Sequence, residues 1–255
     1  MENIKRVLSH VRRAVDDYEM INDGDKIAVG VSAGKDSLTL LCALAELRRF
    51  YPKKFELIAI TVDMGFEDAD FSPIARLCEE LDVPYHIIPT EISRIIFDVR
   101  KEKNPCSLCA KMRRGALYGG ARDLGCTSVA LGHHFDDVVE TFMLNLFYEG
   151  RIGCFQPVTY LSNTGINLIR PMVYMPEKDV RYFASKAALP ISKVKCPADG
   201  NTEREEMKKL LASLERENKG LRYRIFGAIQ RGEIDGFRVM GKMQGMKSYD
   251  VGENE

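Results

Sequence analysis

Hydrophobic residues recur along this chain at two spacings, one typical of helices and the other of strands. Over residues 2–20 they return every three or four positions, which predicts an amphipathic helix. The apolar positions of this helix are Ile4, Val7, Leu8, Val11 and Val15. A polar turn at residues 22–25 follows, and the apolar, β-rich run KIAVGVS after it predicts a strand.

Strands and helices then alternate along most of the chain. The predicted strands are FELIAITVDM, VPYHIIPTEI, TSVALGHH and NLIRPMVYM. The predicted helices are LTLLCALAELRRF, SPIARLCEELD, KMRRGALYGGARDLG, DDVVETFMLNLFYEG and EKDVRYFASKAAL. This alternation predicts a Rossmann-like α/β fold, with a mainly parallel sheet and helices on both faces. Because such sheets bind ligands at the carboxyl ends of their strands, we expect chemistry in the loops after the first and fourth strands.

The last part of the chain differs in composition. From about residue 200 it is charged and helical in pattern, as in EREEMKKLLASLERENKGLRYRIFGAI. We therefore expect a main α/β domain over residues 1–200, including the N-terminal helix, and a charged helical extension over residues 201–255.

Composition narrows the class of protein. Among 255 residues, 37 Lys and Arg balance 37 Asp and Glu, which argues against a generally basic coat for nucleic acid but leaves a local basic face open. We expect no membrane segment, because no apolar run reaches 18 residues, and no secretory signal, because the N-terminus carries charges throughout. Seven cysteines, an odd number, suit the reducing cytoplasm better than a disulfide framework.

A candidate phosphate loop lies between the first predicted strand and the next helix. Its sequence is Ser32-Ala33-Gly34-Lys35-Asp36-Ser37. Small residues let the backbone approach a phosphate, and N–H groups at a helix N-terminus point at the anion. The two serines can add hydroxyl donors and Lys35 a positive charge, whereas Asp36 would suit a Mg²⁺ ion that carries the phosphates. The alternative is an ordinary strand-to-helix turn with an Asp or Ser cap.

A second candidate segment opens the helix after the strand TSVAL. Its sequence is Gly132-His133-His134-Phe135-Asp136-Asp137. Two adjacent carboxylates beside a phosphate site need a cation to neutralise them. The alternative is that both only cap the helix, where negative charge is favoured. Asp63, which follows the strand FELIAITVDM, either joins this site or simply ends its strand.

Three cysteines form a candidate metal site. Cys106 and Cys109 make a C-x-x-C segment, and Cys196 lies far along the chain in KVKCPADG. A lone C-x-x-C fits a redox dithiol, half a zinc site or part of an iron–sulfur site. Three thiolates without a fourth suit a [4Fe–4S] cluster with one open iron, although the pair could also be incidental and Cys196 a bystander. The other four cysteines, Cys42, Cys78, Cys126 and Cys154, are interpreted as structural.

These motifs resemble those of a known superfamily. The segment SAGKDS after a strand is similar to the PP-loop of the N-type ATP pyrophosphatases, which cleave ATP between the α and β phosphates and adenylate a substrate. In those enzymes a G-H-x-x-D-D segment lies opposite, at the nucleotide and its metal. Ala33 stands where the pattern usually has Gly, so we expect a negative φ there.

Most of the chain resembles the tRNA 2-thiocytidine synthetase (TtcA) family. The similar stretches are MINDGDKIAVGVSAGKDS, PCSLCAKMRRGALY, GHHFDDVVETFMLNLFYEGRI and IRPMVYMPEKDV. The resemblance implies that ATP–Mg²⁺ binds the PP-loop, that a cytidine oxygen in a tRNA anticodon loop attacks the α-phosphorus, and that sulfur delivered from a [4Fe–4S] cluster then displaces AMP. It also implies a homodimer and a sulfur donor, either sulfide or a cysteine desulfurase.

The resemblance assigns roles residue by residue. The residues implied to bind ATP are Ser32, Ala33, Gly34, Lys35, Asp36, Ser37, Asp63, Gly132 and His133. Those implied in catalysis are Lys35, Asp36, Arg113, Asp136 and Asp137, with Asp36 and Asp137 as Mg²⁺ ligands. The implied cluster ligands are Cys106, Cys109 and Cys196.

Basic residues near the cysteines and in the extension are candidates for tRNA contact. They are Arg100, Lys101, Lys103, Lys111, Arg113 and Arg114 in the first group, and Lys208, Lys209, Arg216, Lys219, Arg222, Arg224 and Arg231 in the second. The second group could equally be a solvated, salt-bridged helix surface. Three alternative functions stay open: a PP-loop ligase of the lysidine-synthetase type, which needs no cysteines, a sulfurtransferase acting on a small molecule, and a non-catalytic nucleotide sensor, which would bind ATP without releasing pyrophosphate.

Overall fold

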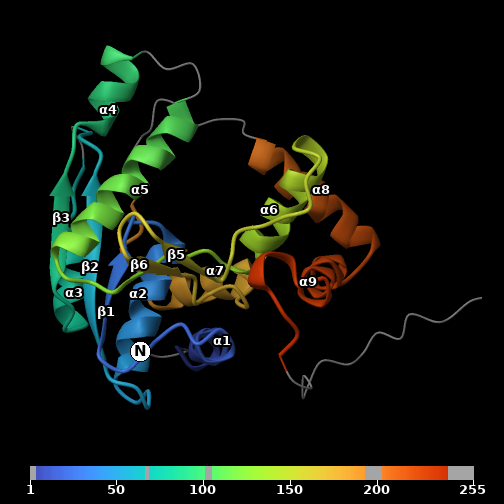
Figure 1. Cartoon of the computed structure of the whole chain (residues 1–255), viewed down its shortest axis with the longest axis horizontal. Helices are drawn as coiled ribbons and strands as arrows, with labels where there is room; N and C mark the ends of the chain where they lie inside the picture. The colour runs from blue at the N-terminus through green and yellow to red at the C-terminus, as the bar shows by residue number, and fades with distance from the viewer. Residues whose placement is uncertain (1–3, 67–68, 101–104, 193–202, 241–255) are drawn as a thin grey trace, which may run out of the picture.

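A six-stranded sheet forms the centre of the molecule (Figure 1). The computed structural model describes residues 4–66, 69–100, 105–192 and 203–240. The strands are β1 (Asp25–Gly30), β2 (Phe55–Asp63), β3 (Tyr85–Pro89), β4 (Ser128–Ala130), β5 (Val158–Leu161) and β6 (Ile166–Ile169). Their spatial order is β3-β2-β1-β4-β6-β5, and only the β5–β6 pair is antiparallel. The predicted mainly parallel α/β sheet is confirmed.

Side-chain alternation along β1 shows how the two faces of the sheet are covered. Ile27 and Val29 belong to the larger hydrophobic cluster and Ala28 to a smaller one, because successive residues of a strand point to opposite faces. Helices α1 (Ile4–Asp17), α2 (Lys35–Arg48), α3 (Ser72–Glu80) and α7 (Glu177–Lys186) contribute to the larger cluster. On the other face, Leu117 and Ala121 of α5 (Pro105–Asp123) pack against the smaller cluster. Helices therefore cover both faces, as predicted.

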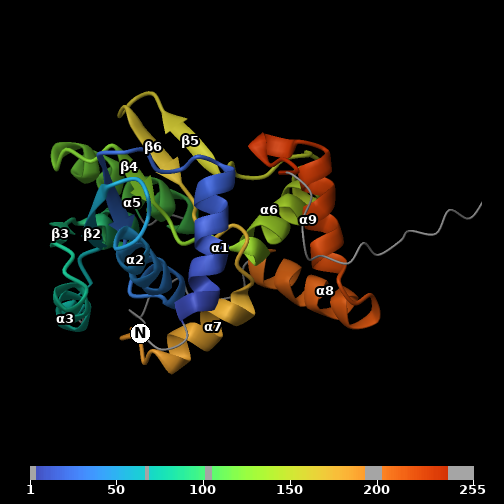
Figure 2. The ribbon, with the colours of Figure 1, turned by 90° about the horizontal axis from the view of Figure 1, so that it is seen from below.

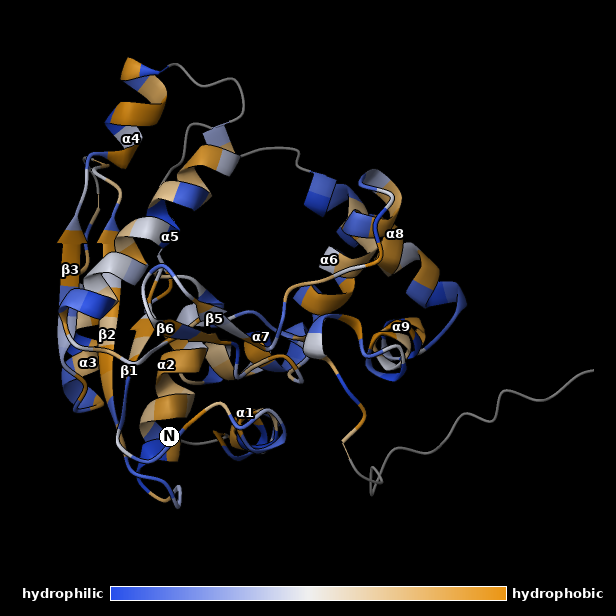
Figure 3. Cartoon of the chain, viewed as in Figure 1, coloured by the Kyte–Doolittle hydropathy of each residue, from blue (hydrophilic) through white to orange (hydrophobic). Residues whose placement is uncertain are grey.

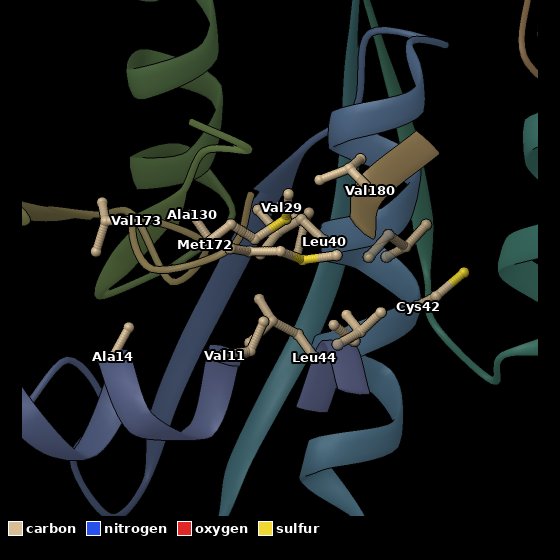
Figure 4. Packing of buried hydrophobic residues seen from close by; sticks show 14 of the residues in the cluster. Val11, Ala14, Val29, Leu40, Cys42, Leu44, Ala130, Met172, Val173 and Val180 are labelled. Atoms are coloured by element: carbon tan, nitrogen blue, oxygen red, sulfur yellow. The ribbon is translucent and has the colours of Figure 1, made fainter. Parts of the chain in front are cut away.

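Helices α1 and α2 pack on the face of the sheet that carries the larger hydrophobic cluster. Figure 4 shows Val11 of α1 near Leu44 of α2, and Leu40 of α2 near Val29 of β1. Leu40 and Leu44 are fully buried, and burial of a leucine side chain contributes about 1.5–3 kcal/mol. In the view from below (Figure 2), α1 runs across the base of the sheet beside α2 and α7. This packing holds α2, and with it the loop that precedes α2, rigidly on β1.

The C-terminal helices pack beside the sheet, on α6 (Phe135–Tyr148). They are α8 (Glu203–Glu217), α9 (Leu221–Arg231) and the 3₁₀ turn η2 (Ile234–Gly236). Met207 and Leu211 of α8 and Phe226 and Ile229 of α9 join the larger cluster. The helical C-terminal extension is confirmed. The expected boundary between residues 200 and 201 lies outside the described residues and stays a prediction.

Some elements differ from the sequence-based expectations. The strand predicted at NLIRPMVYM ends at Ile169, and a turn follows it. The antiparallel strand β5, the short helix α4 (Ile92–Arg94) and the π-helical turn η1 (Ile95–Val99) were not predicted. In Figure 3, β2 is hydrophobic along most of its length, whereas α5 is mixed. Among the described residues, no helix is both long and apolar enough to cross a membrane.

Candidate active site

One large cavity lies at the carboxyl ends of β1, β2, β4 and β6. Its volume is about 1140 Å³, larger than the roughly 300–1000 Å³ of a typical small-molecule site. The loop after β1, the segment after β4 and the start of α5 all line it. The predicted site residues among its lining are Ser32, Ala33, Asp36, Ser37, Asp63, Gly132, His133, Asp137, Cys106, Cys109 and Arg113. The structure thus brings together motifs that are up to about a hundred residues apart.

The loop after β1 has the form of an anion-binding turn. The Ser32 N–H donates to Ser37 Oγ at 3.0 Å, and that hydroxyl is 3.1 Å from the Gly34 carbonyl oxygen to which it donates. Gly34 is the N-cap of α2, and no side chain caps the N–H groups of the first turn. Those uncapped donors and the helix dipole favour a negatively charged ligand at this point. The arrangement therefore suits a phosphate chain.

Ala33 departs from expectation. Its φ is +57°, so the prediction of a negative φ is wrong. A non-glycine residue in the left-handed region costs about 1–3 kcal/mol. Ala33 is nevertheless buried and belongs to the larger hydrophobic cluster, so the surrounding packing holds it there. The loop keeps the conformation that glycine would adopt more easily.

Replacing Ala33 by Gly is expected to raise the free energy of unfolding by about 1 kcal/mol, because glycine relieves the positive φ at no steric cost. Urea unfolding at pH 7 measures the change. Ala45, also buried but inside α2, is the matched control, and there Gly should cost about 1 kcal/mol. Equal losses at both positions would contradict strain at Ala33.

Gly132 and His134 hold the two motifs in contact. A Cβ on Gly132 would lie 2.9 Å from the Asp36 carbonyl carbon, so only glycine allows this approach. The His134 N–H donates to Asp137 Oδ2 at 2.9 Å, and Nδ1 of its ring accepts from the Asp137 N–H at 3.3 Å. Its Nε2 lies 3.6 Å from Asp36 Oδ1. His134 therefore lies between the two carboxylates predicted to bind Mg²⁺.

Asp36 carries an unsatisfied oxygen. Its Oδ1 is buried and has no hydrogen-bond partner among the described residues. An unpaired buried carboxylate oxygen is costly, and a cation would satisfy it. The donor set of Asp36 and Asp137, both carboxylates, suits the oxygen preference of Mg²⁺.

Glu177, at the start of α7, anchors the loop lysine. Lys35 Nζ lies 3.0 Å from Asp36 Oδ2 and 3.2 Å from Glu177 Oε1, and Glu177 also pairs with Arg181 at 2.9 Å and Lys208 at 2.8 Å. Burial raises the pKa of Glu177, but hydrogen bonds from Lys208 and Arg181 and the charge of Lys35 outweigh it, so the pKa falls to about 2. Glu177 was not among the predicted site residues, although the similar stretch EKDV contains it.

Replacing Glu177 by Gln is expected to destabilise the fold in a pH-dependent way. The folded pKa is about 2, against 4.5 without the fold, so the ionised carboxylate contributes up to about 3 kcal/mol. Since the folded pKa is depressed, this contribution is complete above pH 4.5 and is lost as pH falls towards 2. The gap in melting temperature between wild type and Glu177→Gln should be largest at pH 7 and narrower at pH 3.5. A gap independent of pH would contradict the linkage.

The two adjacent aspartates have different environments. Asp137 lines the cavity and pairs with Arg204 of α8 at 3.4 Å. Asp136 is not part of the lining: it accepts from the Glu177 N–H at 2.7 Å and pairs with Arg222 of α9 at 3.0 Å. The structure therefore gives Asp136 the role of joining α6 to α7 and α9. Arg222, which the sequence placed on a basic surface, is only 14% exposed and belongs to this internal network.

The C-x-x-C pair lies in the first turn of α5, which begins at Pro105, before the helix predicted from Lys111. Cys106 is exposed and Cys109 partly so, and both line the cavity. Residues three apart on a helix share one face, and a helix N-terminus favours negatively charged ligands. Cys196 lies outside the described residues. Within the described ranges, no three His, Cys, Asp or Glu side chains are grouped to hold a metal. Two of the three thiols predicted as cluster ligands, Cys106 and Cys109, are therefore the ones that can be placed.

The remaining cysteines are chemically quiet. Burial raises the pKa of Cys42 to about 12, of Cys78 to about 11 and of Cys154 to about 12, and it also raises the pKa of Cys126. A protonated, buried thiol is neither a nucleophile nor a good metal ligand. These environments agree with structural roles.

Several cavity residues were missed or only partly understood from the sequence. Arg170 lines the cavity but was placed within a predicted strand, Phe155 lines it but belonged to no predicted element, and Arg204 lies in the extension. Burial lowers the pKa of His133 to about 4, so its ring is neutral at pH 7; it lies 5.0 Å from the Phe155 ring. Asp63 ends β2 and lines the cavity, and its Oδ1 accepts from the Gly65 N–H at 2.9 Å.

Comparisons with known proteins agree with this site. The model of the PP-loop domain family matches residues 4–212. The tRNA-cytidine(32) 2-sulfurtransferase of Geobacter sulfurreducens is 41% identical over 88% of this chain and 89% of its own length. The protein of the same name from Teredinibacter turnerae is 40% identical over 89% of this chain and 76% of its own length. A similar solved structure is the U34-tRNA thiolase NcsA from Methanococcus maripaludis with its [4Fe-4S] cluster, with a TM-score of 0.74 and 26% identity over 90% of this chain and 79% of that one.

Proposed function

Because this chain belongs to the PP-loop domain family and, within it, to the tRNA-cytidine 2-sulfurtransferases, we propose that it replaces the 2-oxygen of a cytidine in the tRNA anticodon loop by sulfur, at the expense of ATP. By their names, its relatives act on cytidine 32 of the tRNA, and this supports the same position for the proposed target. The chain is a transferase, and the products beside the thiolated tRNA would be AMP and pyrophosphate.

The observation that carries this proposal is the shared cavity. The loop after β1, suited to a phosphate chain, and the C-x-x-C turn of α5 line one space. The proposed reaction first activates an oxygen with ATP and then replaces that oxygen by sulfur. Both steps concern the same carbon atom, so the phosphate loop and the cysteines must both lie close to it. A ligase of the lysidine-synthetase type needs the first group alone, so it leaves the position of Cys106 and Cys109 unexplained.

In the activation step, different residues would bind the ATP phosphates, hold the Mg²⁺ ion and stabilise the developing charge. The first-turn N–H groups of α2, with Ser32, Ser37 and Lys35, would bind the ATP phosphates, while Asp36 and Asp137 would hold the Mg²⁺ ion. The cytidine oxygen then attacks the α-phosphorus and pyrophosphate leaves. Lys35 and Arg113 would offset the negative charge that develops at the phosphates, as preorganised cations do. Asp63, Gly132 and His133 would complete the nucleotide site.

The sulfur step requires a nucleophile beside the activated carbon. Sulfide-level sulfur attacks C2 of the cytidine, and AMP departs with the former oxygen. Cys106 and Cys109, with Cys196 as the proposed third ligand, would hold a [4Fe–4S] cluster, which when bound supplies that sulfur from an iron without a protein ligand. The two described thiols fit this role because they are accessible from the cavity and lie on one side of a helix.

Partners and location follow from this chemistry. The tRNA would reach the cavity with an anticodon loop, whose unpaired bases can be turned out. A cysteine desulfurase or free sulfide would renew the sulfur, and we propose a homodimer in the reducing cytoplasm, where free thiols persist.

The test is an assay on protein purified without oxygen. About four irons and matching sulfide per chain are expected, and incubation with ATP, Mg²⁺, sulfide and tRNA transcript should give 2-thiocytidine by mass spectrometry together with AMP and pyrophosphate. A transcript with uridine at the target position is the control. Formation of AMP without iron and without thiolated RNA would favour the ligase. Failure of the tRNA to bind even at low salt would favour a small-molecule acceptor.

A further inference from the structure

Arg170 is a buried cation without a counter-ion. Its side chain follows β6 directly and is 8% exposed, yet it forms no ion pair with any described residue. Its Nη1 donates to the Gln156 carbonyl oxygen and lies 3.3 Å from Thr159 Oγ1, while its Nε is buried and has no partner within the described ranges. A charge taken out of water in this way is costly unless something compensates it.

The surroundings of Arg170 are positive and aromatic. Its guanidinium lies 4.9 Å from the centre of the Phe155 ring, a cation–π contact that fixes its plane. The pKa of Arg170 is lowered to about 10: burial is the largest cause and the charge of Arg114 acts in the same direction, while Tyr118 and Cys154, which are neutral at pH 7, oppose it. Arg170, Arg114, Tyr118 and Phe155 all line the cavity. A guanidinium in a fixed position, with a second arginine nearby and no described carboxylate within ion-pair distance, is the arrangement of a phosphate receptor.

The position of Arg170 separates it from the ATP site. In the sheet order, β4 lies between β1 and β6, so Arg170 starts two strands from the phosphate loop, a distance of about 10 Å. Among the residues proposed for ATP, Asp63 ends β2, Ser32–Ser37 follow β1, and Gly132 and His133 follow β4. ATP would therefore lie along the ends of β2, β1 and β4 and leave the end of β6 to the second substrate.

We propose that Arg170, oriented by Phe155 and assisted by Arg114, binds a backbone phosphate of the RNA beside the cytidine that enters the cavity. This rests on the proposed function and adds to it the contact that positions the acceptor. The phosphate supplies the negative charge that the buried guanidinium lacks, and one contact beside the reacting nucleotide sets how deeply its base reaches towards the ATP.

The same geometry sets an expectation for stability. Because Arg170 is an uncompensated buried charge in the free protein, Arg170→Met should leave the melting temperature unchanged or raise it. A structural role, in which Arg170 holds the chain at Gln156 and Thr159, predicts a lower melting temperature and normal RNA affinity of the folded protein. The two roles therefore predict different changes in melting temperature and different changes in RNA affinity.

The binding test uses full-length protein and an anticodon stem-loop RNA containing the target cytidine. Arg170→Met should weaken RNA binding about tenfold or more, as loss of a charged hydrogen-bond pair does. The slope of log affinity against log salt should fall by about 0.7, the change for one single-strand phosphate contact. Affinity for ATP–Mg²⁺ should stay within about twofold of wild type. Arg49→Met, at an exposed arginine paired with Glu46, is the matched control and should change none of these.

A second experiment changes the RNA instead of the protein. Replacing the phosphate 5′ or 3′ of the target cytidine by a neutral methylphosphonate should, at one of the two positions, weaken binding to wild type about tenfold and have little further effect on Arg170→Met. Because this experiment uses the wild-type protein, it tests the proposal even if Arg170→Met does not fold. Unchanged RNA affinity in both experiments would overturn the proposal. A selective loss of ATP affinity in Arg170→Met would assign Arg170 to the nucleotide instead. If wild type binds no RNA at all, the proposed function fails, not this contact alone.

Discussion

Replacing Cys106 by Ser is expected to abolish sulfur transfer while leaving ATP activation largely intact. A serine hydroxyl is a hard, protonated group at neutral pH and a poor ligand for iron, whereas a cysteine thiolate is soft and anionic. Cys106 is exposed at the first turn of α5, so the substitution should change the free energy of unfolding by less than about 0.5 kcal/mol. Loss of activity would then report chemistry and not misfolding.

Three measurements separate these effects for Cys106→Ser. Iron and acid-labile sulfide should fall well below wild type, 2-thiocytidine should drop below about 1% of the wild-type yield, and tRNA-dependent release of pyrophosphate should stay within about threefold. Cys109→Ser should behave in the same way, because its thiol lines the same cavity. Cys126→Ala is the control, since that thiol is buried against the smaller hydrophobic cluster, away from the cavity lining. Full iron and normal thiolation in Cys106→Ser would remove it from the proposed ligand set, and Cys196→Ser tests the third ligand by the same readouts.

Replacing Asp137 by Ala is expected to lower the rate of pyrophosphate release at least about a hundredfold, the size of effect seen when one preorganised electrostatic group is removed from an active site. Asp137 lines the cavity beside the loop after β1 and is linked to Asp36 through the ring of His134. Loss of its carboxylate removes a proposed Mg²⁺ ligand. Asp36→Ala should give a loss of similar size, and raising the Mg²⁺ concentration should partly restore either variant if the defect lies in metal affinity.

The matched control for Asp137→Ala is Asp123→Ala. Asp123 also pairs with an arginine, Arg122 at 2.9 Å, but on an exposed surface of α5, where such a pair contributes about 0–1 kcal/mol. Asp136→Ala gives the contrasting result: a lower melting temperature, because the Glu177 N–H and Arg222 lose their acceptor. Wild-type pyrophosphate release in Asp137→Ala would exclude it as a metal ligand, and a catalytic loss in a stable Asp136→Ala would return Asp136 to the reaction.

The sequence by itself determined the parts of this protein that depend on neighbours along the chain. A strand, a short loop of small residues and a helix in this order indicate a phosphate loop, because the N–H groups at the helix N-terminus then lie at the end of the strand. The same local logic holds for residues 132–137 after β4. Their meeting at one edge of the sheet could also be predicted, since carboxyl ends of parallel strands lie together.

Only the tertiary structure decided which side chains face the cavity. Asp136 and Asp137 are adjacent, but successive residues of a helix point about 100° apart, and the packing of Phe135, Val138 and Val139 into the core sets the rotation of α6. That rotation turns Asp137 to the cavity and Asp136 to Arg222. Arg170 likewise falls within the strand predicted at NLIRPMVYM, but in the structure the pairing of β6 with β4 ends at Ile169. The positive φ of Ala33 has the same origin, because the packing around a buried loop, and not its own preference, sets its backbone.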